Sequence, residues 1–129
     1  MLKLDNYFDI KWLVFAITFT ATIILLTHIP QEVMPTRLQT SGLDKLEHVM
    51  AYGLITFLFI LSPRNSYSML SASLLFFAVL VVGAIDELTQ PFVNRIASFT
   101  DWLANVIGIV TVLLLSIVGK RQFQKTNTE

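Results

Sequence analysis

The 129-residue sequence contains no cysteine, which excludes disulfide bonds, thiol nucleophiles and thiolate metal sites. Charged residues make up only 14% of the chain, and the nine basic residues balance the nine acidic ones, so a nucleic-acid partner is not indicated. There are two histidines, and neither a glycine-rich phosphate loop nor a nucleophile motif is present. The sequence therefore carries no standard catalytic signature.

Apolar residues, in contrast, are abundant. They make up 54% of the chain, and the mean hydropathy is +0.67, which exceeds what a water-soluble domain of this size can bury in one core. A membrane-spanning helix needs about 20 mostly apolar residues, and open strands are not viable in lipid. We therefore predict an all-α fold, with a single domain over residues 1–129 that forms a four-transmembrane-helix bundle. The expected spans are residues 12–29, 43–62, 66–90 and 100–119, followed by a polar cytoplasmic tail at 120–129.

The orientation follows from the basic residues, which favour the cytoplasmic side. With the amino terminus inside, six basic residues lie in the cytoplasm and three lie outside. The six are Lys3, Lys11, Arg64, Lys120, Arg121 and Lys125, and the three are Arg37, Lys45 and Arg95. We therefore expect both termini to be cytoplasmic, in a multi-pass protein of the cytoplasmic (inner) membrane.

Ionisable side chains gather where the second span begins and around the connection between the third and fourth spans. At roughly 100° per residue, each group occupies one arc of its helix. The arcs hold Asp44, Lys45, His48 and Tyr52 on the second helix, Gly83, Asp86, Glu87 and Gln90 on the third, and Asp101, Asn105 and Gly108 on the fourth. Because charge is costly at membrane depth, we predict a polar pocket at the extracytoplasmic ends of helices 2, 3 and 4.

Several of these residues also have simple structural interpretations. Ser41 to Asp44 and Ser98 to Asp101 fit the Ser-x-x-acid pattern of helix capping, and Lys45 can extend to the head groups. His48 can make a structural hydrogen bond, and Asn105 and Gly108 suit helix packing. Glu87 must be protonated or paired, with Arg95 or Lys45 as the expected partner. Glu47 and Asp86 are expected at the rim.

Three sequence blocks then occur in a set order. They are Asp44-Lys45-Leu-Glu-His48-Val-Met-Ala-Tyr52, Glu87-Leu-Thr-Gln90, and Arg95 followed by Asp101-Trp-Leu-Ala-Asn105-Val-Ile-Gly108. In this order the blocks, which extend over about half of the chain, resemble the VanZ-like family of membrane proteins. The resemblance implies a bacterial envelope protein, because the founding member of that family is linked to low-level resistance to the lipid-bearing glycopeptide teicoplanin. It does not imply a particular reaction.

The residues leave three classes of function open. The protein could be an enzyme, with His48 and Glu87 as the catalytic acid and base, a binding protein with the same pocket, or a structural subunit whose polar cluster only locks helix packing. The predicted ligand-binding residues are Asp44, Lys45, Tyr52, Gln90, Arg95, Asp101 and Asn105.

The charges near the pocket favour a ligand with a mixed head group. Five acidic side chains outnumber Lys45 and Arg95, whereas the two helix amino termini favour anions. We therefore expect a lipid or lipid-linked amphiphile at the outer leaflet. Asp44, His48, Glu87 and Asp101 are acceptable metal ligands, but one histidine among dispersed acids is weak evidence, so we assign no metal and no other cofactor.

Overall fold

The computed structural model describes residues 7–33, 41–63 and 68–126. Four long helices account for most of them: α1 (Ile10–Thr27), α2 (Ser41–Leu61), α3 (Met69–Thr89) and α4 (Phe99–Thr126). Two short 3-10 helices, η2 (Gln31–Val33) and η4 (Gln90–Val93), follow α1 and α3, and no strand is formed in these ranges. The expected all-α fold is confirmed. Because α4 continues to Thr126, the first part of the predicted tail is helical, while residues 127–129 lie outside the described ranges.

Three segments are long and apolar enough to cross a membrane: Ile10–Thr27, Leu70–Val93 and Phe99–Gly119. Helix α2 has 21 residues, about 31 Å at 1.5 Å per residue, but it is not among these three segments. It differs from the others because Asp44, Lys45 and Glu47 all lie in its first two turns. The sequence therefore builds one helix with a charged beginning among three apolar helices.

Local sequence explains the helix ends. The Asp9 carboxylate accepts a hydrogen bond from the backbone N–H of Lys11 at 3.1 Å and starts α1, and the Ser68 hydroxyl caps α3 in the same way through Ser71. After η4, Asn94 adopts a left-handed conformation with φ of 58°, which asparagine tolerates well. This turn redirects the chain towards α4.

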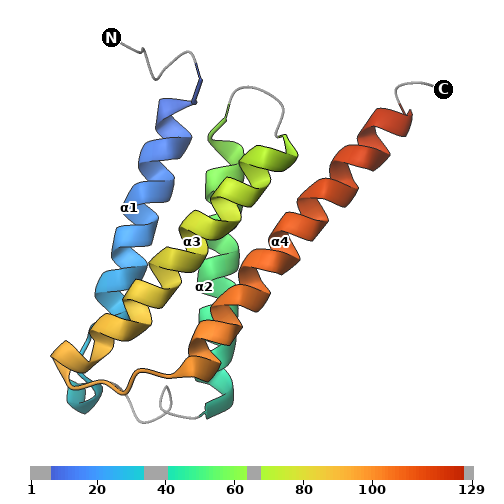
Figure 1. Ribbon diagram of the computed structural model, residues 1–129. Coiled ribbons are helices and arrows are strands. Elements are labelled where there is room, and N and C mark those ends of the chain that lie inside the picture. The colour runs from blue at the N-terminus through green and yellow to red at the C-terminus, as the bar shows by residue number, and fades with distance from the viewer. Residues whose placement is uncertain (1–6, 34–40, 64–67, 127–129) are drawn as a thin grey trace.

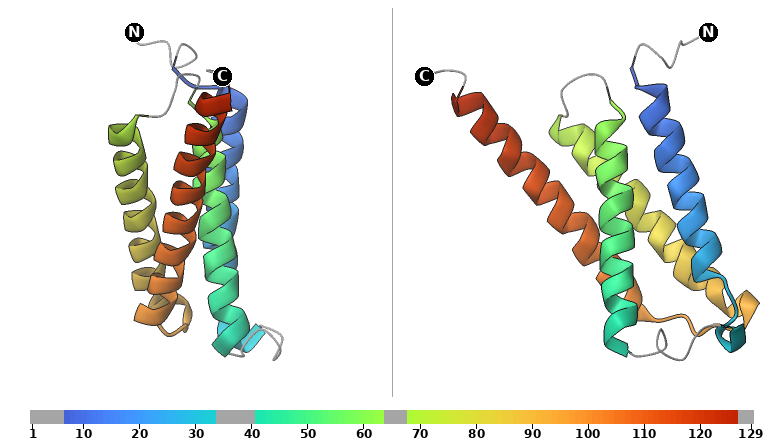
Figure 2. Two further views of the ribbon diagram at one scale, coloured as in Figure 1. Left: turned by 90° about the vertical axis from the view of Figure 1, so that its right-hand side faces the viewer. Right: turned by 180° about the vertical axis from the view of Figure 1, so that it is seen from behind.

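The four helices alternate in direction (Figure 1). The first turn of α1 and the last turn of α4 lie at the same end of the molecule, as the predicted topology requires. At the other end, the close of α1, the start of α2, the close of α3 and the start of α4 come together, whereas the second half of α4 diverges from its neighbours (Figure 2). Lys3, Arg37 and Arg64, which entered the orientation argument, lie outside the described residues.

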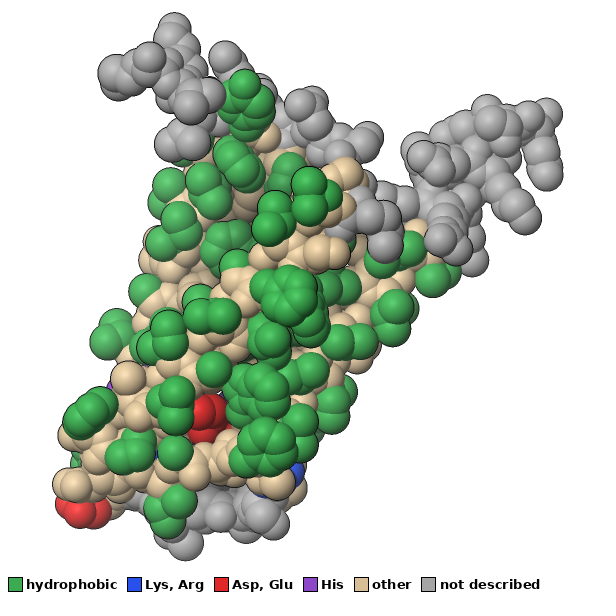
Figure 3. Space-filling model, viewed as in Figure 1, with side chains coloured by type: hydrophobic (Ala, Val, Ile, Leu, Met, Phe, Trp, Pro, Cys, Tyr) green, Lys and Arg blue, Asp and Glu red, His purple; other side chains and the backbone are tan. Residues whose placement is uncertain are grey.

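The surface of the protein is apolar and one end of its interior is polar. Large hydrophobic side chains are exposed on every long helix, including Leu25, Met50, Leu74 and Leu115, and they cover much of the face in Figure 3. The buried polar side chains include His48, Asp86, Glu87, Asp101 and Asn105. This distribution is the reverse of that in a water-soluble protein, and it indicates a multi-pass membrane protein whose ionisable groups face inwards.

Helices α2 and α4 approach each other most closely at Gly108. A Cβ atom at this position would overlap the carbonyl oxygen of Val49 and lie 2.9 Å from the backbone nitrogen of Gly53. Both obstacles are backbone atoms of α2, so a side chain at residue 108 would push the two helices apart. Gly108 therefore permits the contact that brings the polar residues of α2 and α4 together.

We predict that Gly108→Ala destabilises the protein by about 1–3 kcal/mol, the usual cost of overpacking. Thermal unfolding in detergent would measure the effect. Gly53→Ala is the matched control, because its Cβ would meet Gly108 and Val112 at 3.5 Å, an ordinary contact distance. Equal stability of the two variants would contradict the close approach.

Candidate functional site

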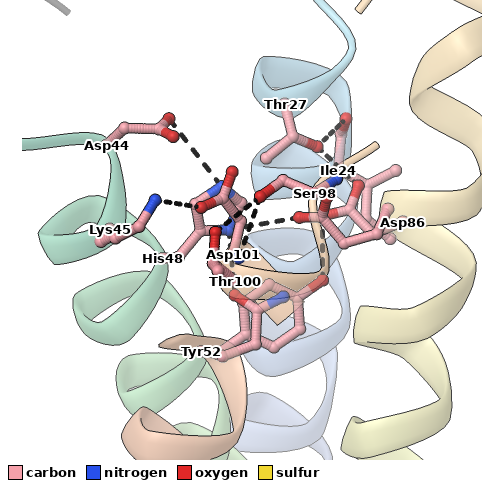
Figure 4. Close-up of polar contacts among 12 residues, drawn as sticks. Ile24, Thr27, Asp44, Lys45, His48, Tyr52, Asp86, Ser98, Thr100 and Asp101 are labelled. Atoms are coloured by element: carbon pink, nitrogen blue, oxygen red, sulfur yellow. Dashed lines mark hydrogen bonds and ion pairs between the residues drawn. The ribbon is translucent and has the colours of Figure 1, made fainter. Parts of the chain in front are cut away.

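Polar side chains from all four helices meet where the helix ends converge (Figure 4). We call this set the polar cluster. Its members are Thr27 and His28 at the end of α1, Asp44, Lys45, His48 and Tyr52 of α2, Asp86, Glu87 and Gln90 at the end of α3, and Asp101 and Asn105 of α4. The pocket residues predicted from the sequence are thus brought together, and α1 adds two residues that were not predicted.

His48 lies at the centre of the cluster. Its side chain is only 6% exposed, and its Nδ1 is 2.9 Å from Oδ1 of Asn105 on α4. The same Nδ1 is 3.7 Å from Oε1 of Glu87 on α3, and Nε2 is 4.0 Å from Oδ1 of Asp44 one turn earlier on α2. One imidazole ring therefore links three helices.

Lys45 and Asp101 form a second link between α2 and α4. Lys45 Nζ donates to Asp101 Oδ1 at 2.9 Å. The lysine side chain is 42% exposed and the aspartate side chain 12%, so the ion pair lies at the edge of the cluster. Because it is partly exposed, it contributes modestly to stability and mainly fixes the position of the Asp101 carboxylate.

Glu87 binds the beginning of α4. Its Oε2 accepts a hydrogen bond from the backbone N–H of Ser98 at 3.2 Å, while the Ser98 hydroxyl accepts from the backbone N–H of Asp101 at 3.3 Å. In the predicted capping pattern, Asp101 would provide the carboxylate. Here Glu87 of α3 takes that place, and Asp101 is free to bind Lys45 instead. The equivalent pattern at Ser41 cannot be compared, because that side chain lies outside the described residues.

The predicted rim position of Asp86 is wrong. Asp86 is only 1% exposed. Its Oδ2 accepts from the Tyr52 hydroxyl at 3.0 Å, its Oδ1 accepts from the Thr27 hydroxyl at 2.6 Å, and His28 Nδ1 lies 3.5 Å from Oδ1. The prediction failed because it considered only helices 2, 3 and 4, whereas Thr27 and His28 at the end of α1 also reach Asp86. The signal was in the sequence: Thr27 and His28 end the first span on the same side of the membrane as the other charges.

The remaining predicted residues divide between the interior and the edge. Gln90 is buried at the start of η4, and Arg95 is half-buried after it. Glu47 is exposed, as expected for a rim residue. Thr89 was not predicted to take part, but its hydroxyl lies 2.9 Å from His28 Nε2 and so joins α3 to α1.

A cavity of about 680 Å³ lies against the cluster, between α1 and α2. Most of its wall is apolar, and a smaller part is formed by ionisable or polar residues. The apolar part includes Phe19, Ile23, Leu26, Met50 and Leu54, and the polar part consists of Thr27, Asp44, Glu47, His48, Tyr52 and Arg95. This volume lies in the range of ordinary small-molecule sites.

Comparisons of the chain with protein-family models, with characterised proteins and with solved structures gave no match. Its function is therefore inferred from its own residues.

Three kinds of chemistry suit this arrangement. His48 and Glu87 are close enough for proton exchange through a small shift or one water. Asp44, His48 and Asp101 place potential metal-ligand atoms within 4.8 Å of one another. In addition, Glu87 Oε1, Gln90 Nε2 and Asn105 Nδ2 are buried without a hydrogen-bond partner in the described part of the chain, so the cluster retains unused capacity to bind a polar group.

The burial of Asp86 leads to a test of stability. Asp86→Leu leaves the buried Tyr52 hydroxyl without its acceptor, which should cost about 1–3 kcal/mol, whereas the Thr27 hydroxyl can still donate to the Ile24 carbonyl at 2.9 Å. We expect a clearly lower midpoint of thermal unfolding in detergent. Glu47→Leu, which replaces an exposed acid on α2, should have little effect, and similar midpoints for the two variants would restore the rim interpretation.

Proposed function

We propose that this chain is a VanZ-like protein of the bacterial cell envelope that binds or processes a lipid or lipid-linked amphiphile at the extracytoplasmic leaflet. The observation that carries the proposal is the cavity between α1 and α2, with apolar residues along one part of its wall and ionisable residues along the other. An amphiphile has the same division, with acyl chains at one end and a polar head at the other. The cavity therefore suits a ligand that comes from the membrane.

The charges on the cavity wall narrow the choice of head group. Asp44 provides negative charge and Arg95 provides positive charge, whereas exposed Glu47 lies at the rim. A head group that carries both a phosphate or carboxylate and an amine can be matched by these residues, because each of its charges meets one of opposite sign. A purely apolar ligand is poorly suited to this wall, because it offers no opposite charge to the charged residues.

The proposal includes a route for processing. Glu87 and His48 are buried and 3.7 Å apart, and His48 lines the cavity. Glu87 Oε1 has no hydrogen bond within the described residues, so it can accept a proton from a bound hydroxyl or amine, while His48 can donate one. We assign the acid and base roles to this pair on that basis.

The resemblance of the Asp44 to Gly108 blocks to the VanZ-like family supplies the physiological part of the proposal. A protein that captures a lipid-bearing glycopeptide or its lipid-linked target would lower sensitivity to teicoplanin. We therefore propose that the protein is associated with low-level resistance to teicoplanin.

A structural role is the second candidate, and specific contacts favour it. Glu87 caps α4 through Ser98, Lys45 binds Asp101 across α2 and α4, and Asp86 binds Thr27 of α1. Each contact joins two helices, so the cluster could lock a scaffold or an interaction subunit without any ligand.

Variants that remove a charge but nearly keep the shape of the side chain distinguish the ligand-binding function from the structural one. Glu87→Gln and His48→Gln keep the size of the side chain and part of its hydrogen bonding, so a structural cluster should tolerate them, or be stabilised by the loss of a buried charge. If the site binds or converts a ligand, we predict that both variants lose their activity. Both should still unfold at the same temperature as the original protein. The readout is the teicoplanin sensitivity of host cells with equal amounts of each protein in the membrane.

Glu47→Gln is the matched control, because it also removes one carboxylate from the cavity wall but from an exposed position. It should keep at least most of the phenotype. If Glu87→Gln and His48→Gln both protect the cells as well as the original protein does, the ligand role of the pair is wrong and the structural role stands. Mass spectrometry of lipids that co-purify with the original protein, compared with Glu87→Gln, would identify the ligand.

A further inference from the structure

Three side chains at the polar end of the cavity have the geometry of a cation site. One carboxylate oxygen of Asp44, one of Asp101 and a ring nitrogen of His48 lie within 4.8 Å of one another, and Nε2 of His48 is 4.0 Å from Asp44 Oδ1. Ligand atoms of a tetrahedral Zn²⁺ site with bonds of about 2.0–2.2 Å are about 3.3–3.6 Å apart. Side-chain movements of about 1 Å would therefore bring all three onto one ion.

The hydrogen bond of His48 to Asn105 is an independent indication. Because Nδ1 donates to the Asn105 carbonyl oxygen at 2.9 Å, a neutral imidazole carries its lone pair on Nε2. That nitrogen points towards Asp44 from a side chain that is 94% buried, yet 4.0 Å is too long for a hydrogen bond. A carbonyl group that holds the other ring nitrogen is the usual second partner of a metal-binding histidine.

The charge of the surroundings also calls for a cation. Asp44, Asp86, Glu87 and Asp101 bring four carboxyl groups to the convergence of the helices. The basic side chains nearby are Lys45, bound to Asp101, and Arg95. Buried carboxylates in excess of their basic partners must be protonated or must bind a cation.

We propose that Asp44, His48 and Asp101 bind a divalent transition-metal ion, Zn²⁺ or Mn²⁺, at the polar end of the cavity. Imidazole together with carboxylates suits these ions, whereas Mg²⁺ and Ca²⁺ prefer oxygen ligands alone. Three protein ligands leave at least one coordination position for another group. With the ion bound, His48 acts as its ligand and no longer as the acid of the pair. Glu87, 3.7 Å from the other ring nitrogen of His48, remains the base.

A bound ion would also restrict the class of head group that the cavity accepts. This inference rests on the proposed function. Asp44 and His48 both line the cavity, so the open coordination position would face its interior. A divalent ion there would reverse the local negative charge and attract a phosphate or carboxylate oxygen. The head group would thus bind the metal through its anionic part, while its acyl chain lies along Phe19, Ile23 and Leu26.

The metal alone provides the first test. The full-length protein in detergent, stripped with a chelator, should bind one equivalent of Zn²⁺ or Mn²⁺ by isothermal titration calorimetry, and its thermal midpoint should rise. Asp44→Asn, His48→Gln and Asp101→Asn should each weaken binding at least about tenfold, as expected for loss of a group that orients or forms a metal site. Glu47→Gln, an acid one residue before His48 that is not in the ligand set, should bind normally.

For Lys45→Met we predict the opposite effect, an increase in metal affinity. Lys45 is a cation bound to Asp101, so it competes with the metal, and its removal should strengthen metal binding. A purely structural cluster would lose its ion pair in this variant without gaining any affinity. An increase for Lys45→Met together with a loss for His48→Gln would support the site.

Two results would overturn the metal proposal: no binding of either ion by the folded protein, or equal binding by Glu47→Gln and the three ligand variants. Lipid capture is measured separately. If lipid co-purifies but neither ion binds, the metal site is wrong and the proposed function stands. If an ion binds at these residues but no amphiphile is captured with or without it, the metal site stands and the proposed function fails.

Discussion

A buried charge in an apolar surrounding must find its partner inside the same protein, and this constraint organises the molecule. Lipid-facing positions of the helices are occupied by large hydrophobic side chains, so water cannot reach most carboxylates of the cluster. Asp86 therefore binds hydroxyls from two other helices, Glu87 binds the first backbone N–H before α4, and Asp101 binds Lys45. Each of these contacts crosses from one helix to another.

The same constraint positions the candidate site. Because the partners of each carboxylate come from different helices, the four helix ends are held together at one end of the molecule, while α4 diverges at the other (Figures 1 and 2). Gly108 allows α4 to come close enough to α2 for His48 to reach Asn105. Beside this rigid end, α1 and α2 enclose a cavity that is apolar along one part and charged along the other. The side chains of the polar cluster thus both hold the helices together and line a candidate binding site. For this reason the structural and ligand-binding interpretations involve the same residues.

The sequence predicts the helices well because uninterrupted apolar runs and the Pro30 and Pro91 breaks mark them directly. It also predicts the shared faces of α2, α3 and α4, since helical periodicity alone places His48, Glu87 and Asn105 towards one another. Periodicity cannot predict which partner each group selects, and so Glu87 was expected to pair with Lys45 or Arg95 rather than with Ser98 and His48. Nor does it reveal that Thr27 and His28 at the end of α1 reach Asp86, because the rotation of one helix relative to another depends on tertiary packing.

Cysteine cross-linking in native membranes tests the central claim, that buried polar faces of α2 and α4 meet at this end. The chain has no native cysteine to interfere. His48→Cys with Asn105→Cys replaces two side chains whose polar atoms are 2.9 Å apart, and a short thiol cross-linker should join them efficiently. Met50→Cys with Ile107→Cys places the same groups on exposed faces of the same helices and should remain unlinked. Efficient linkage of the Met50 and Ile107 pair, with none of the His48 and Asn105 pair, would contradict the account.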